Sequence, residues 1–204
     1  MVNVKLNIFS CEYRLMPQPI LRKAVRILRP IELTLLFSEL SFKDRVFFNA
    51  LFFTGMRYVE VVRLHENMEW FEGKFINLPK GAIKKVKVEF DERSVRLNIK
   101  GQKAIKTFLS GPQLPTRAGW GQILKKAAIR AGLDPVGLCA KTTRKTWESW
   151  LTIVNKNNNT ALNLITLSQG HTKETSISHY LGLPFTRYEE KEMIIGSHSV
   201  SEWL

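Results

Sequence analysis

The stretch VFFNALFF at residues 46–53, followed by TGMRYVE at residues 54–60, decides the fold of this chain. The first part is apolar on nearly every face, which predicts a helix buried in the core of a domain. Ser41 can cap this helix at its start, and Gly55 is expected to end it. Helical spacing resumes over Arg57–Leu64, so a buried helix is expected to break at Gly55 and lead into a second helix.

Hydrophobic spacing on both sides of this pair predicts a chain made mainly of helices. Three short runs in the middle, Lys74–Leu78, Val86–Phe90 and Val95–Ile99, have the character of strands and are separated by turn residues. The predicted fold class is therefore mainly α with a small antiparallel three-stranded sheet (α+β). The expected helices are Ile20–Arg29, Ile31–Leu40, one around Ala104–Leu109, one around Ile123–Ala131, Cys139–Val154, one capped by Thr160 and broken by Gly170, Lys173–Tyr180 and Phe185–Ile195.

The charge balance favours a polyanionic partner. The 204 residues include 31 Lys and Arg against 18 Asp and Glu, a formal charge of +13, and neutralising phosphates with such residues releases condensed counterions. A solvated basic surface without such a partner is the alternative. No apolar run is long enough to span a membrane, and the N-terminus has no secretion signal. Cys11 and Cys139 make no disulfide framework, so a cytoplasmic location is expected.

Two arginines occur where a helix is expected to begin. Arg57 shares a helical face with core positions and is expected to point inward, with Glu60 three residues on as a partner. Lys141 and Arg144 lie on one face of a first helical turn, where the macrodipole disfavours cations. A phosphate at that helix end would make the arrangement favourable. The alternatives are a structural ion pair at Arg57 and a solvated basic turn at Lys141.

The third feature is a Gly-His pair followed by Tyr nine residues later. Gly170 is expected to break a helix, so that His171 can donate a hydrogen bond from a loop. Tyr180 lies at the end of a short predicted helix, where its phenol can be presented at the surface of a cleft. A lone His or Tyr is more often a packing or surface residue, but no Walker, zinc-protease or serine-hydrolase motif competes for the chain.

The order and spacing of these residues resemble the tyrosine recombinase family over about residues 41–182. The matching pieces are Thr-Gly-Met-Arg-x-x-Glu at residues 54–60, a sheet with a lysine-bearing turn, an arginine that opens a helix, and Gly-His with Tyr nine residues later. The family comprises integrases, resolvases and phage or plasmid recombinases. Lys141 departs from it, standing where the family usually has His, and this looks like the variant of archaeal virus and plasmid integrases. An ordinary ammonium is a poor base at neutral pH, which puts proton transfer at that position in doubt.

The resemblance implies a role for each matching residue. Tyr180 would attack a DNA phosphodiester and form a 3′-phosphotyrosine. Arg57 and Arg144 would hold the nonbridging oxygens, and His171 would donate a hydrogen bond to the same phosphate. No metal or cofactor is implied. Lys80 would protonate the leaving 5′ oxygen, with Lys84 and Lys85 as alternatives. Glu60 would orient an arginine, and Lys141 would complete the catalytic residues.

The resemblance also implies domains and partners. Residues 41–185 would form the catalytic domain, after an N-terminal segment with lead-in helices over residues 1–40. Residues 186–204 would be a tail that docks on a neighbouring protomer, with packing on its own domain as the alternative. The expected partner is double-stranded DNA, on which the chain would form a tetrameric synapse. The alternative functions are type IB topoisomerase-like relaxation of DNA and a catalytically silent DNA-binding domain.

Overall fold

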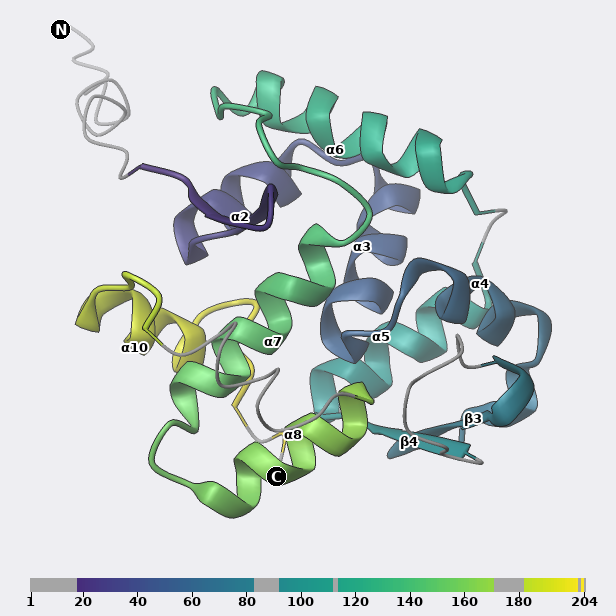
Figure 1. The fold of residues 1–204 in the computed structure, drawn as a ribbon. Coiled ribbons are helices and arrows are strands. Elements are labelled where there is room, and N and C mark those ends of the chain that lie inside the picture. Colours follow the sequence, from purple (N-terminus) through teal and green to yellow (C-terminus); the bar gives the residue numbers. More distant parts are fainter. Residues whose placement is uncertain (1–17, 83–91, 112–113, 171–181, 202, 204) are drawn as a thin grey trace, which may run out of the picture.

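A computed structural model describes residues 18–82, 92–111, 114–170, 182–201 and 203 (Figure 1). Helix α3 (Phe42–Thr54) is the buried helix that the sequence predicts. The Ser41 hydroxyl accepts a hydrogen bond from the Asp44 N–H at 3.4 Å, and Gly55 ends the helix with a φ of 59°. Both ends of α3 therefore confirm the prediction.

The other described helices follow the predicted spacing, with ends that differ by a few residues. Helix α8 is capped by Asn158, whose side chain accepts from the Ala161 N–H at 3.0 Å, so Thr160 lies inside the helix and is not its cap. The predicted helix Lys173–Tyr180 lies outside the described residues. None of the described helices is both long and apolar enough to cross a membrane. The bounds are α2 Pro30–Ser38, α4 Tyr58–Glu66, α5 Ile99–Leu109, α6 Arg117–Arg130, α7 Thr142–Val154, α8 Asn159–Gln169 and α10 Arg187–Ile195, with short 3-10 helices η2 Met68–Trp70 and η3 Lys80–Ala82.

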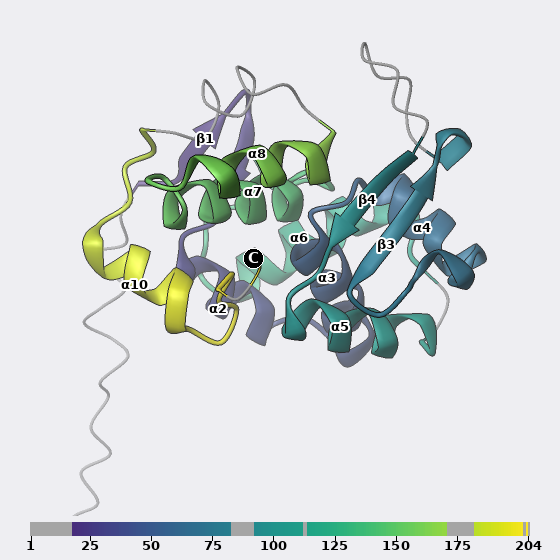
Figure 2. The same cartoon turned by 90° about the horizontal axis from the view of Figure 1, so that it is seen from below.

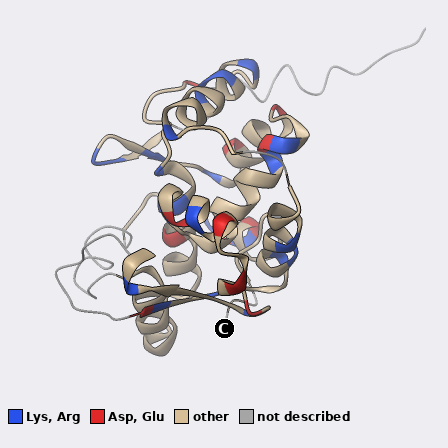
Figure 3. Cartoon of the chain, turned by 90° about the vertical axis from the view of Figure 1, so that its right-hand side faces the viewer, with Lys and Arg blue, Asp and Glu red and all other residues tan. Residues whose placement is uncertain are grey.

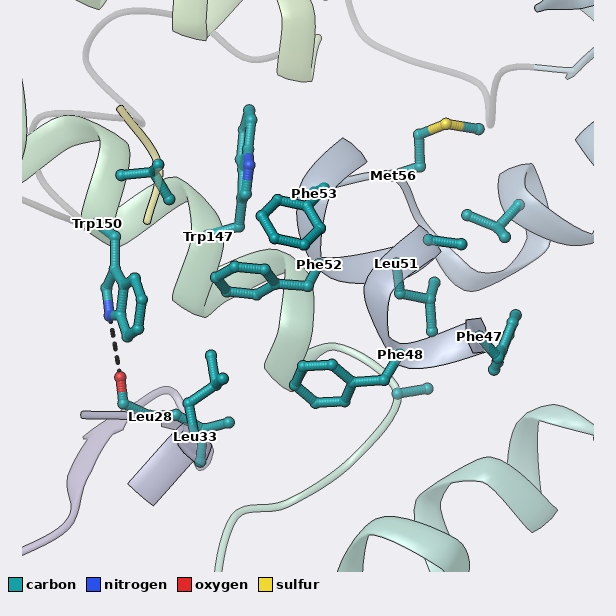
Figure 4. Packing of buried hydrophobic residues seen from close by; sticks show 14 of the residues in the cluster. Leu28, Leu33, Phe47, Phe48, Leu51, Phe52, Phe53, Met56, Trp147 and Trp150 are labelled. Carbon is teal, nitrogen blue, oxygen red and sulfur yellow. Dashed lines mark hydrogen bonds between the residues drawn. The ribbon is translucent and has the colours of Figure 1, made fainter. Parts of the chain in front are cut away.

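The core lies around α3, which packs against α5 and α7. Aromatic rings on α3 meet two buried tryptophans of α7, Trp147 and Trp150 (Figure 4). The Trp150 ring meets Phe52 edge to face, and its Nε1 donates to the Leu28 carbonyl at 3.0 Å. That bond satisfies the indole N–H in apolar surroundings and ties the chain entering α2 to α7.

The first described segment is a β-hairpin, so the prediction of a helix over residues 20–29 is wrong. Strands β1 (Ile20–Arg22) and β2 (Val25–Ile27) pair antiparallel. Lys23 and Ala24 form the turn with φ values of 48° and 57°, the left-handed pair that a two-residue hairpin turn needs. The sequence has no glycine or asparagine there to signal such a turn, and β2 packs on α7. Contacts remote in the sequence therefore override the helical spacing.

The second sheet has two strands among the described residues, and not the three expected. Strand β3 (Phe75–Pro79) pairs antiparallel with β4 (Glu92–Arg96), and Ile76 lies opposite Val95. The expected middle strand, Val86–Phe90, lies outside the described residues. Figure 2 shows this sheet with α4 and α5 at one end of the molecule, and the β1–β2 hairpin and α10 at the other.

The segment after Phe185 packs on its own domain, which is the alternative that the sequence left open. Met193, Val200 and Trp203 are buried, and Nε1 of Trp203 donates to the Arg96 carbonyl at 3.0 Å. Docking of this segment on a neighbouring protomer stays a prediction. Tyr188 of α10 is 71% exposed and could contact such a partner.

Candidate functional site

Arg57 lies at the start of α4, held there by Glu60. The Glu60 carboxylate accepts from the Arg57 backbone N–H at 2.7 Å through Oε2, and from its guanidinium at 2.7 Å through Oε1. This is a capping box, which satisfies backbone donors at a helix start. Glu60 is fully buried, whereas 26% of the Arg57 side chain is exposed. The predicted pair is confirmed, and Arg57 forms its solvent-facing side.

The second cation on Glu60 is Arg93, which lies among the turn residues expected between Val86–Phe90 and Val95–Ile99. Arg93 lies in β4, is buried, and donates from Nη2 to Glu60 Oε2 at 2.7 Å. The signal was available: Arg93, Val95 and Leu97 alternate with exposed or half-buried residues, and such a period of two marks one face of a strand. A charged residue on the apolar face of that strand pointed to a buried partner.

Arg144 brings the start of α7 to the same place. Its guanidinium donates to the Gly55 carbonyl at 2.7 Å and to the Gln169 carbonyl at 2.7 Å, so it bridges the ends of α3 and α8. Gly55 also lets Trp147, one turn after Arg144 on α7, pack closely against the end of α3, because a Cβ there would lie 2.6 Å from the Trp147 ring. We call Arg57, Glu60, Arg93 and Arg144 the arginine cluster.

The cluster carries more positive than negative charge. Among the described residues it holds three guanidinium groups, and the carboxylates that act on them are Glu60 and the buried Glu148 of α7, which interacts with Arg144. Burial alone would raise the pKa of Glu60, but Arg93, Arg144 and Arg57 outweigh it and lower the pKa to about 2. Burial lowers the pKa of Arg144 to about 10; Glu148 opposes this shift, and Arg57 and Arg93 add to it. Such crowding of like charges favours an anion beside them.

Lys80 lies at the end of the sheet nearest to the cluster. It begins η3, immediately after β3. Leu78 near the end of β3 pairs with Arg93 of β4, the residue that contacts Glu60, so this end of the β3–β4 sheet lies beside the cluster. Arg63 of α4 fixes the turn by donating to the carbonyls of residues 81 and 82, each at 2.9 Å. The Lys80 side chain is exposed. Its alternatives, Lys84 and Lys85, lie outside the described residues.

Lys141 and Arg144, which were expected on one face of a helical turn, lie in different surroundings. Lys141 immediately precedes α7 and is exposed, and it lines a hollow against the β1–β2 hairpin and α6, whereas Arg144 is buried in the cluster. His171 and Tyr180 lie outside the described residues. Gly170 does end α8, with a φ of 64°. The carbonyl that Arg144 and Arg93 both contact belongs to Gln169, two residues before His171.

Within the part of the chain that the structure describes, no three His, Cys, Asp or Glu side chains are close enough together to hold a metal ion. Comparison with known proteins identifies no relative: no family model, no curated protein and no solved structure matches the chain significantly. The function of the site has to be inferred from its geometry and from the motif resemblance.

Proposed function

We propose that this chain is a tyrosine recombinase, a DNA strand transferase that carries out site-specific recombination or integration through a 3′-phosphotyrosine. One observation carries the proposal. Arg57 and Arg144, far apart in the sequence, meet in one cluster with an excess of positive charge, and that cluster is bonded to the Gln169 carbonyl. By the motif resemblance the two remaining reactive groups follow this point in the chain, His171 two residues after Gln169 and Tyr180 nine residues after His171.

The chemistry follows from the charge that builds on a phosphate under attack. The Tyr180 phenol loses its proton to solvent as its oxygen forms a bond to phosphorus; the bond to the 5′ oxygen breaks, and negative charge grows on the nonbridging oxygens. Preorganised guanidinium groups stabilise that charge, and their planar forks match two oxygens at once. Lys80 supplies the proton that the departing 5′ oxygen needs. The phosphotyrosine keeps the energy of the broken bond, so a DNA 5′-hydroxyl can reverse the step and rejoin the strand.

A purely structural ion network is the simplest alternative for the cluster. Replacing a buried ion pair by well-packed apolar side chains is often neutral or stabilising, and a buried charge without a partner is costly, so an unbalanced network is a poor device for stability alone. Among the described residues three guanidinium groups face two carboxylates, and the most exposed of them is Arg57, one of the two arginines that the motif assigns to the phosphate. An anion bound at Arg57 would restore the charge balance, which favours a binding role over a structural one.

Covalent trapping tests the proposal. The intact chain is incubated with a pool of nicked duplexes of random sequence, in which a broken strand prevents rejoining, and denaturant-resistant protein–DNA adducts are counted and sequenced. We expect adducts with the intact chain, none with Tyr180→Phe, and an undiminished yield with Tyr188→Phe as the matched control. Absence of any adduct would contradict the proposal and favour the alternative of a catalytically silent DNA-binding domain. An adduct accompanied by relaxation of supercoiled DNA, without joining of two duplexes, would indicate the topoisomerase-like alternative.

A further inference from the structure

A second basic feature lies outside the arginine cluster, where the β1–β2 hairpin approaches the starts of α6 and α7. The hollow there has a volume of about 630 Å³, and we call it the hairpin groove. Val25 forms one wall, residues 138–141 form another, and α6 forms the third with Arg117, Gly121 and Lys125. These three lie at i, i+4 and i+8, on one face of the helix. The described residues that line the groove include three cations and no acidic residue.

Like charges are crowded along the hairpin side of this groove. Lys145, one turn after Lys141 on α7, donates from Nζ to the Arg22 carbonyl of β1 at 2.8 Å. Burial lowers the pKa of Lys145, and Lys141 and Lys23 lower it further. Figure 3 shows the hairpin projecting from the body of the molecule, with its basic residues in blue. Some exposed cations elsewhere in the described part of the chain pair with carboxylates, as Lys156 does with Glu190 at 2.9 Å, whereas no described acidic residue lines the groove.

Gly121 indicates that something approaches α6 closely. Glycine inside a helix is unfavourable relative to alanine, and no packing contact at this position requires it, because a Cβ there would have no atom within 4 Å. Gly121 instead lies between Arg117 and Lys125 on the wall of the groove. A bare backbone between two cations suits a ligand whose charged groups reach the cations and whose body touches the helix.

The groove is held in shape before any ligand binds. The Arg26 N–H of β2 donates to the Gly137 carbonyl at 2.9 Å, and the Leu28 N–H donates to Thr146 of α7 at 3.0 Å. Gly137 is required at this contact, because a Cβ would lie 2.9 Å from the Arg26 nitrogen. The hairpin is therefore fixed to the segment that leads into residues 138–141 and to α7, so this side of the groove needs little reordering on binding.

We propose that the hairpin groove binds the sugar–phosphate backbone of duplex DNA beside the cleavage site. Phosphates are the groups that cations without carboxylate partners attract, and Lys141 lies one helical turn from Arg144, so one strand could run from the cluster into the groove. The inference rests on the proposed function only in naming DNA as the partner. It does not need the chain to cleave DNA.

The test compares two double variants with equal loss of charge. Arg117→Ala/Lys125→Ala removes two groove cations, and Lys103→Ala/Lys106→Ala removes two exposed cations from α5. Affinity for a labelled duplex is measured by anisotropy over a range of KCl concentrations. The slope of log affinity against log salt should fall by about 2 in the groove variant, about 1 for each lost phosphate contact, and by much less in the α5 variant. Equal falls, or no fall in either, would overturn the groove as a binding surface.

Gly121→Leu tests the same surface without a change of charge. The space around Gly121 admits a side chain, and leucine is a better helix former than glycine, so the melting temperature should hold or rise while affinity for duplex DNA falls severalfold. Unchanged affinity would contradict the proposal. So would a preference for duplex RNA over duplex DNA that is the same in the intact chain and in the variant. Covalent trapping separates this proposal from the proposed function: a chain that forms no adduct but shows these binding differences would refute catalysis and retain the groove.

Discussion

The described part of the chain holds two buried ion networks that differ in charge balance. Near the hairpin, Arg26 pairs with Glu32 at 2.7 Å and Arg29 pairs with Glu189 at 2.8 Å, so each guanidinium has its own carboxylate. In the arginine cluster, by contrast, three guanidinium groups share two described carboxylates: Glu60 contacts Arg57 and Arg93, and Glu148 interacts with Arg144.

The difference in charge balance indicates different roles: the balanced pairs hold the fold together, and the unbalanced cluster is suited to binding a ligand. The balanced pairs join distant segments: Arg26 to the start of α2, and Arg29 to the start of α10. Their charges cancel, so nothing further is needed from solvent or ligand. The cluster also joins distant segments, through Gly55 and Gln169, but its charges do not cancel. A buried network with surplus positive charge and one exposed guanidinium is arranged for an anion.

The largest effect is expected from Arg57→Ala. Loss of a preorganised donor to the transition state should slow adduct formation by about 10²- to 10³-fold. The free energy of unfolding should fall by only about 1 kcal/mol, because Arg57 is partly exposed and Glu60 keeps Arg93. Trapping rates and urea unfolding measure the two quantities. Arg130→Ala, which removes an exposed arginine paired with Glu39, is the control and should change neither strongly.

The balanced network should show the opposite pattern. Glu32→Ala leaves Arg26 buried without its carboxylate and removes the acceptor for the Arg29 N–H at 2.9 Å. Breaking such a pair costs about 3–5 kcal/mol of unfolding free energy, measurable by urea titration at neutral pH. Glu39→Ala breaks an exposed pair and should cost about 1 kcal/mol or less. Similar losses for the two variants would mean that burial does not determine how much each ion pair contributes to the free energy of unfolding.

The pH dependence of stability should report Glu60. Its pKa is lowered in the folded chain to about 2, so its contribution is present above the unfolded pKa near 4.5 and is lost as pH falls toward 2. The full loss amounts to about 3 kcal/mol at 1.36 kcal/mol for each pKa unit. Glu60→Gln should therefore flatten the decline of unfolding free energy below pH 4.5. An equally steep decline in this variant would show that other carboxylates cause it.

The smallest effect is expected from Lys141→Ala. Removing a cation from the start of α7 should raise the unfolding free energy by about 0.3–1 kcal/mol, because the helix macrodipole disfavours it there. The salt slope of DNA affinity should fall by about 1, the value for one lost phosphate contact. A variant that gains stability and keeps its slope would remove Lys141 from the binding surface.

The sequence predicted the parts of the fold and site that local signals determine. The apolar run of α3, its Ser41 cap and its Gly55 end are local features, as is the i, i+3 pair of Arg57 with Glu60. The hairpin at residues 20–27 was missed because its turn uses lysine and alanine in a left-handed conformation that only tertiary contacts stabilise. The alternation of Arg93 with Val95 and Leu97 could have indicated that Arg93 is buried, but no local pattern reveals its partner Glu60, 33 residues away on another element. The burial of Trp203 likewise depends on Arg96 and Trp147, which no pattern in the tail reveals.

The central claim is that the arginine cluster acts on the charge of a phosphate, and a neutral substrate tests it most directly. Once trapping has identified a cleavage site, the adduct-forming rates of the intact chain and of Arg57→Ala are compared on a phosphodiester and on a methylphosphonate at that position. The methyl group removes the negative charge that Arg57 would neutralise. The account predicts a loss of about 10²- to 10³-fold on the phosphodiester and a much smaller loss on the methylphosphonate. Equal losses on the two substrates would contradict it, because Arg57 would then act on something other than the phosphate charge.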